Sequence, residues 1–213
     1  MAKVPSAAIS RLVTYLRILE DLEARGINRT SSEQLAEEAQ VTAFQVRKDL
    51  SYFGSYGTRG VGYTVQILRR ELRQILGLNR KWGLAIVGMG RLGQAIADYP
   101  GFSEIFDLRG LFDRDPSKFS MTFRGMNVEG MDNLPRAVAE RRIEFGLLAV
   151  PADSAQAVAN RLVESGIKGI LNFAPVVLEV PKEVAVENVD FLAGLSRLSF
   201  FVLNPKWREE MIG

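Results

Sequence analysis

The chain of 213 residues contains no cysteine and no histidine. Without cysteine it has no disulfides, no thiolate nucleophile and no usual structural zinc site. Without histidine it has no imidazole to serve as a general base or a metal ligand. The sequence also lacks an apolar run long enough to cross a bilayer, and its first residues lack the apolar core of a signal peptide. We therefore expect a cytoplasmic protein that binds neither a metal nor a membrane.

The net charge of +2 conceals an uneven distribution of charge along the chain. Residues 1–81 contain 13 Lys or Arg against 8 Asp or Glu, whereas residues 82–213 contain 14 against 17. A basic amino-terminal third predicts a polyanionic partner for that third, with chance variation in composition as the alternative.

Short helices are expected in the first domain, which we place at residues 1–78. Ser31 and Thr42 each stand three residues before a glutamine, which is the spacing of a capping box at the start of a helix. The helix that follows Thr42 is expected over residues 43–52. The apolar residues of the surrounding segment, 41–54, include Phe44, Val46, Leu50 and Phe53.

A glycine-rich segment, 54–65, follows that helix and predicts two short strands around a tight turn. Helix, turn, helix and hairpin in this order outline a winged helix-turn-helix, whose second helix lies in the major groove of DNA. Arg and Lys pair with guanine, Gln pairs with adenine, and an Arg between glycines can enter a narrow minor groove. The alternative for each basic residue is a solvated helix face. The candidate DNA-binding residues are Gln45, Arg47, Lys48, Ser51, Tyr52 and, in the hairpin, Arg59.

The pattern changes after a predicted linker at residues 77–82. Nearly continuous apolar runs alternate with helical segments, which is typical of parallel strands that are covered on both faces. This alternation predicts a doubly wound Rossmann sheet, and we place that domain at residues 79–192. The expected strands are 84–87, 108–113, 145–150, 168–173 and 188–192.

A dinucleotide-binding turn is predicted where Gly88, Gly90 and Gly93 connect a strand to a helix. The first glycine allows the tight turn, the second lets the backbone approach a pyrophosphate, and the third lets helix and strand pack closely. Asp113 lies 20 residues past Gly93 at the end of the next strand, where a carboxylate binds ribose hydroxyls and repels a 2′-phosphate. NAD(H) is therefore expected, and Arg114 keeps NADP(H) as an alternative.

An enzymatic role is not expected, although a dinucleotide usually serves hydride transfer. A dehydrogenase generally needs a proton carrier, and here none of the 5 tyrosines has a lysine four residues later. The residues after the first domain are also only enough for one nucleotide-binding domain, so no additional domain is predicted to hold a substrate. The alternative function is a small NAD-dependent dehydrogenase whose amino-terminal part is an oligomerisation module.

The last segment, 193–213, begins as a helix that is apolar around most of its circumference. Such a helix must be buried on more than one side. We expect it to pack against a partner subunit, with a groove in its own domain as the alternative.

The segment SSEQLAEEAQVTAFQVRKDLSYFGSYGTRGVGY, together with VGMGRLGQA and NVDFLAGLSRLSF, resembles the bacterial Rex family of redox-sensing repressors. The resemblance extends over essentially the whole chain. It implies a homodimer with an amino-terminal winged helix, a Rossmann domain and an exchanged carboxy-terminal helix. It further implies binding to palindromic operators, release of the DNA when NADH closes the dimer, and weak competition by NAD+.

The resemblance also implies how the nicotinamide is recognised. Tyr99 and Phe191 match residues of the family's nicotinamide pocket, and Arg17, Tyr99 and Asp190 match its switch contacts. In this interpretation the cofactor is a signal, because a pocket that resists the charged oxidised ring accepts the neutral reduced ring. The candidate cofactor-binding residues are Gly88, Met89, Gly90, Arg91, Leu92, Gly93, Tyr99, Asp113, Val150, Pro151 and Phe191.

Overall fold

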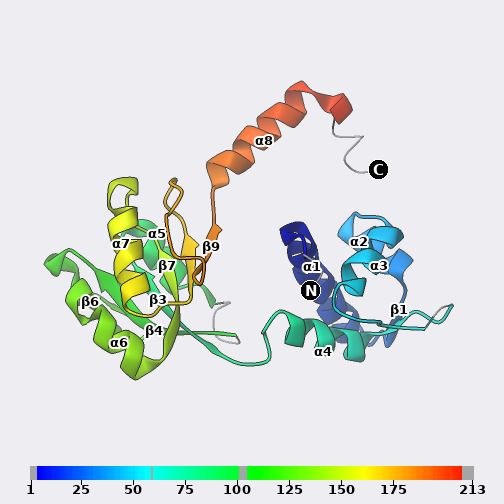
Figure 1. The fold of residues 1–213 in the computed structure, drawn as a ribbon, viewed down its shortest axis with the longest axis horizontal. Helices are drawn as coiled ribbons and strands as arrows, with labels where there is room; N and C mark the ends of the chain where they lie inside the picture. Colours follow the sequence, from blue (N-terminus) through cyan, green and yellow to red (C-terminus); the bar gives the residue numbers. More distant parts are fainter. Residues whose placement is uncertain (1–3, 59, 101–104, 208–213) are drawn as a thin grey trace. The chain divides into compact units, whose positions relative to one another are not determined.

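The computed structural model describes residues 4–58, 60–100 and 105–207, so Arg59 of the predicted hairpin lies outside the described residues. The chain divides into two compact units (Figure 1). One contains the residues up to 79 and those from 198 onward, and the other is Arg80–Arg197. Among the described residues, no helix combines the length and the apolar character needed to cross a membrane.

The amino-terminal unit has the element order of a winged helix. Its elements are α1 (Ser6–Ala24), β1 (Arg29–Thr30), α2 (Ser32–Ala39), α3 (Ala43–Ser51), β2 (Tyr63–Thr64) and α4 (Val65–Ile75). The hydroxyl of Ser31 accepts a hydrogen bond from the amide of Gln34 at 3.2 Å, and that of Thr42 accepts one from Gln45 at 3.1 Å. Both predicted helix starts are thus confirmed, because each cap satisfies an amide that the first turn leaves unpaired.

The predicted hairpin differs from what the structure contains. Thr58 and Gly62 form an isolated antiparallel bridge, and β2 pairs with β1, which lies before α2, instead of with a second strand of the hairpin. Gly62 has a φ of +81°, and a Cβ there would meet the carbonyl oxygen of Thr30. Glycine at this position therefore permits the close approach of β1 to the second half of the segment.

The second unit is a doubly wound α/β fold, which confirms the Rossmann prediction. Its strands have the order β5-β6-β4-β3-β7-β8-β9, and all pairs are parallel except β5 with β6. The elements are β3 (Trp82–Val87), α5 (Arg91–Ala97), β4 (Phe106–Asp113), η2 (Pro116–Lys118), β5 (Thr122–Phe123), β6 (Met126–Gly130), η3 (Met131–Asn133), α6 (Leu134–Arg141), β7 (Ile143–Leu148), α7 (Ala152–Glu164), β8 (Gly169–Asn172), β9 (Ala185–Asn188) and α8 (Phe191–Leu203).

Both faces of this sheet are covered, as its apolar strands predict. Ala85 and Val87 of β3 belong to a core with α6 and α7, whereas Leu84 and Ile86 belong to a second core with α5. The chain leaves β3 toward β4 on one side and later returns to β7 on the other. A reversal of strand order of this kind opens a crevice at the carboxyl ends of the central strands.

Some predicted boundaries were wrong. The strand predicted at 188–192 shares only Asn188 with β9, because the carboxylate of Asp190 accepts a hydrogen bond from the amide of Ala193 at 2.9 Å and helix α8 begins at Phe191. The predicted linker is also shorter than 77–82, since Trp82 already pairs with Phe106 in the sheet. The guanidinium of Arg80 lies 3.4 Å above the Trp82 ring and pairs with Glu144 at 2.8 Å.

Candidate functional site

The glycine turn lies at the carboxyl end of β3, in the crevice of the sheet. Gly88 has a φ of +97°, and a Cβ there would meet the carbonyl oxygen of Ala149. A Cβ on Gly93 would meet the carbonyl oxygen of Gly88, so this glycine lets α5 pack onto the strand. Gly90 differs, because a Cβ there would project into open space. The fold therefore needs the first and third glycines, while the second leaves room for a ligand.

Asp113 ends β4 beside this turn and is held by three donors. Its carboxylate accepts hydrogen bonds from the Met89 amide at 2.7 Å, the Asp115 amide at 2.9 Å and Nζ of Lys118 at 2.7 Å. Burial alone would raise the pKa of Asp113, but the three hydrogen bonds, with that of Lys118 the strongest, lower it below its usual value. The group is therefore an ionised acceptor at neutral pH.

A cavity of about 280 Å³ adjoins these residues. Five of the candidate cofactor-binding residues line it, namely Gly88, Gly90, Asp113, Val150 and Pro151. Arg114, Lys118 and Ser154 also line it, and none of the three was among the predicted cofactor-binding residues. Lys118 could have been suspected only from its position five residues after Asp113. The cavity is lined by two cations, Arg114 and Lys118, and by two carboxylates, Asp113 and Asp115, and the amino end of α5 beside Gly90 has no side-chain cap.

The other candidates at the cofactor site do not line this cavity. The side chain of Met89 is fully buried in the core, so only its backbone faces the turn. Arg91 and Leu92 are exposed in the first turn of α5. The side chains of Tyr99 and Phe191 are 60% and 64% exposed, so within the single chain neither forms part of an enclosed apolar pocket.

The predicted switch residues belong to different units. Arg17 is exposed on α1 in the amino-terminal unit, whereas Tyr99 and Asp190 belong to the second unit. The carbonyl oxygen of Tyr99 accepts a hydrogen bond from Nη2 of Arg124 at 2.8 Å. The carboxylate of Asp190 caps α8 through the Ala193 amide. Their roles as switch contacts stay predictions.

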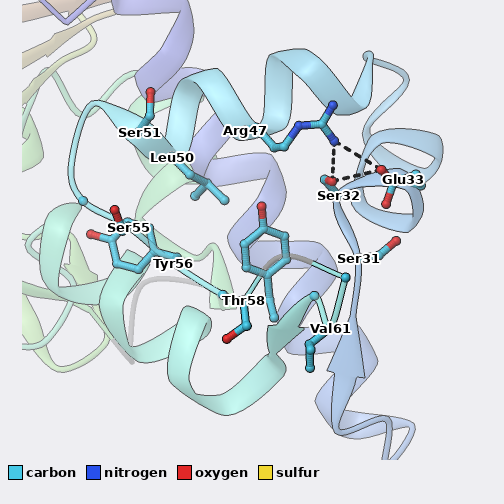
Figure 2. Close-up of a pocket in the computed structure, with 15 residues that line it drawn as sticks. Ser31, Ser32, Glu33, Arg47, Leu50, Ser51, Ser55, Tyr56, Thr58 and Val61 are labelled. Carbon is cyan, nitrogen blue, oxygen red and sulfur yellow. Dashed lines mark hydrogen bonds and ion pairs between the residues drawn. The ribbon is translucent and has the colours of Figure 1, made fainter.

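A groove of about 800 Å³ lies between α3, the start of α2 and the segment that precedes β2 (Figure 2). Arg47 extends from α3 across one end of this groove. Its Nη1 donates to the hydroxyl of Ser32 at 2.8 Å and to Oε1 of Glu33 at 3.2 Å. Tyr56, Thr58 and Val61 line the opposite side. Because Arg47 and Glu33 are largely exposed, this pair is easily exchanged for contact with another anion.

Asp49, on the inner side of α3, was missed by the sequence analysis. It is fully buried, and its carboxylate accepts hydrogen bonds from Arg11 at 2.6 and 2.8 Å, from Tyr15 at 2.9 Å and from Gln45 at 2.7 Å. Burial alone would raise the pKa of Asp49, but the bonds from Arg11, Gln45 and Tyr15 outweigh it and lower the pKa. A charged residue within the apolar stripe of a predicted helix is the signal that could have revealed it.

The hydrogen-bond network around Asp49 distinguishes Gln45 from the other candidate DNA-binding residues. Gln45 is half-buried and donates its side-chain amide to Asp49, so it faces the interior of the unit more than the other polar candidates do. Lys48 and Ser51 are exposed, and Tyr52 is half-buried at the end of the helix. Over the described parts of the chain, no group of three or more acidic side chains could hold a metal ion.

Two protein families match parts of the chain. Residues 3–51 match the family described as "Putative DNA-binding protein N-terminus", and residues 79–176 match the CoA binding domain family. The second match begins shortly before β3 and covers the glycine turn and Asp113. The two matches therefore correspond to the two sites described above.

Curated relatives match over nearly the whole chain. The redox-sensing transcriptional repressor Rex of Thermus thermophilus is 75% identical over 99% of this chain and 100% of its own length. That of Deinococcus radiodurans is 51% identical over 97% of this chain and 96% of its own length. Among solved structures, the Rex-family repressor RSP is 39% identical. The structure of RSP with beta-NAD+ and operator DNA matches this chain with a TM-score of 0.90, and the match covers 99% of this chain and 98% of the RSP chain. The structure of RSP with beta-NADH matches with a TM-score of 0.86 and covers 100% of both chains.

Proposed function

The chain belongs to the Rex family of redox-sensing transcriptional repressors, and we propose that it binds palindromic operator DNA as a homodimer and releases it when NADH binds. The main support for this proposal is that one chain contains two candidate sites and that Rex-family proteins match this chain over nearly their whole length. One site is the cavity at Gly90 and Asp113, and the other is the exposed face of α3. The dehydrogenase alternative is not favoured, because these relatives are repressors.

The dinucleotide is held in the crevice of the second unit. The pyrophosphate lies against the backbone at Gly90, where the amino end of α5 favours negative charge. The ribose hydroxyls of the adenosine bind to the ionised carboxylate of Asp113, whose position the Met89 amide and Lys118 fix. Val150 and Pro151 line the same cavity and extend it toward the nicotinamide.

The oxidised and reduced cofactors differ in charge at the nicotinamide ring. Tyr99 and Phe191 are exposed within one chain, and in the closed dimer they cover this ring. Burying an unpaired charge costs several kcal/mol, and each ~1.4 kcal/mol changes an affinity tenfold. A preference for NADH of roughly a thousandfold is therefore reachable by exclusion of water alone. The carboxylate of Asp190, which would favour NAD+, is engaged with the amide of Ala193.

The signal reaches DNA through the geometry of the dimer. Two recognition helices must lie about 34 Å apart, or a multiple of this distance, to enter successive major grooves of a palindrome. A ligand that favours the closed dimer weakens DNA binding by the same factor by which DNA weakens ligand binding. We assign the winged helix to 1–78, the Rossmann domain to 79–192 and the exchanged helix to 193–213, and no catalytic step to any of them.

Fluorescence anisotropy on a labelled palindromic duplex tests this function. NADH should release the protein at concentrations at which NAD+ leaves the complex intact, at a fixed salt concentration because phosphate contacts depend on salt. Absorbance of NADH is followed with carbonyl substrates in parallel. DNA binding that NADH does not change, or turnover of NADH, would contradict the proposal.

A further inference from the structure

One face of α3 carries four exposed residues. Phe44, Arg47, Lys48 and Ser51 follow the spacing i, i+3, i+4 and i+7, which places them on the same side of a helix. The opposite side carries Val46, Asp49 and Leu50, which are buried. Phe44 was predicted among the apolar residues of the helix, but it is 66% exposed. It is therefore the apolar member of a polar and basic face.

Among the described residues of the amino-terminal unit, no core contact explains a phenylalanine at this position. Phe44 lies outside the core cluster that includes Val46 and Leu50. The start of the helix is already capped by the hydroxyl of Thr42. Phenylalanine also favours a helix less than alanine does. The ring therefore remains available for a contact with another molecule.

Resting on the proposed binding to operator DNA, we propose that Phe44 reads a thymine through contact between its ring and the 5-methyl group of that base. The amino-terminal residues of a recognition helix meet the base edges in the major groove. Each base pair presents hydrogen-bonding groups there, and thymine adds a methyl group, which is the apolar feature that Phe can contact. Arg47 and Lys48 lie one turn further on, so the cationic part of this face complements the same polyanion.

The charge around Phe44 argues for DNA over a second protein subunit as the occupant. The exposed apolar residues of α8 are numerous and adjacent, as a protein interface requires, whereas Phe44 is a single ring beside two cations. Association through this face would bring the cations of both copies together. Thymine contact needs only the ring, so Lys48 can still bind guanine or phosphate, and so can Arg47 when it exchanges its contact with Glu33.

Replacement of thymine by deoxyuridine tests the contact, because it removes only the methyl group. The probe is the operator duplex of the RSP complex, with each thymine replaced in turn at symmetric positions of both half-sites. Replacement of thymine at one position should weaken binding of the native protein about fourfold per half-site. This loss of affinity corresponds to the burial of roughly one methylene group. Phe44→Ala should bind the unmodified duplex more weakly by a similar factor and lose all sensitivity at that position. Phe44→Leu should retain part of the sensitivity to deoxyuridine at that position.

Ile67→Ala is the matched control, because Ile67 is a 52% exposed apolar residue on α4 of the same unit. It should keep the deoxyuridine profile of the native protein, and all three variants should keep the native melting temperature. If the native protein binds the duplex but no deoxyuridine position depends on Phe44, the inference fails and the proposed function stands. If the native protein does not bind the duplex, both fail. A changed oligomeric state of Phe44→Ala with an unchanged profile would assign the ring to a protein contact instead.

Discussion

Arg11 of α1 holds Asp49 of α3 through two hydrogen bonds, with Nε donating to one carboxylate oxygen at 2.6 Å and Nη2 to the other at 2.8 Å. The fork fixes the recognition helix against the first helix, and it leaves the face of Phe44, Arg47 and Lys48 turned to solvent. A paired and fully hydrogen-bonded carboxylate of this kind is tolerated inside a protein, whereas an unpaired one is not.

Asp49→Asn should lower the free energy of unfolding at pH 7 by about 3 kcal/mol, because Arg11 would lose its partner. The folded-state pKa of Asp49 lies below its value in the unfolded chain, which is about 3.9. Its contribution is therefore present above this value and is lost as the pH falls through the lower folded-state pKa. Urea denaturation between pH 3 and pH 7 should show the two proteins converging in acid. Asp21→Asn, an exposed partner of Arg25, serves as the control with little effect.

Gly90→Ala and Gly93→Ala should have opposite consequences. Gly90 has a φ of −77° and open space around a Cβ, so alanine should keep the melting temperature. NADH affinity should fall at least about tenfold, because the methyl group occupies the place of the pyrophosphate and disturbs a charged hydrogen bond. Gly93→Ala should lower the melting temperature itself, since its Cβ meets the Gly88 carbonyl. Unchanged NADH binding by Gly90→Ala, measured by calorimetry, would place the pyrophosphate elsewhere.

Asp113→Asn should reduce the preference for NADH over NADPH. The substitution removes the charge that repels a 2′-phosphate and releases Lys118, which together with Arg114 lines the cavity. We expect NADH affinity to fall about tenfold and NADPH affinity to rise. Adding Lys118→Ala should reverse the gain for NADPH. Calorimetric titration measures the affinities for NADH and NADPH. The control Asp107→Asn, on the same strand, should change neither affinity.

Leu198→Glu with Val202→Glu should convert the proposed homodimer into monomers. Among its described residues, α8 buries none, although its apolar side chains include Leu192, Leu198 and Val202. A partner that covers this helix would have to bury two new charges. Sedimentation equilibrium measures the change. Ser196→Glu, an exposed polar position of the same helix, should leave the dimer intact, and a double variant that stays dimeric would remove α8 from the interface.

Features that depend on a few neighbouring residues could be predicted from the sequence. The caps at Ser31 and Thr42 are contacts between residues three apart, and the glycine turn needs small residues at fixed positions. The alternating strands and helices followed from the hydrophobic pattern for the same reason. The end of β9 was misplaced, because Phe191 and Leu192 suit either a strand or a helix and the Asp190 cap decides between them.

Tertiary structure decided what depends on residues far apart in the chain. The charge of Asp49 is explained by Arg11, which lies 38 residues earlier, and this contact also turned Gln45 inward. The exposure of Phe44 follows, since its neighbours on the opposite side of α3 fill the core. Local patterns specify which elements form, because their hydrogen bonds and caps are local. Only the packing of those elements determines which face of the recognition helix meets solvent, because that face is whatever the other helices leave uncovered.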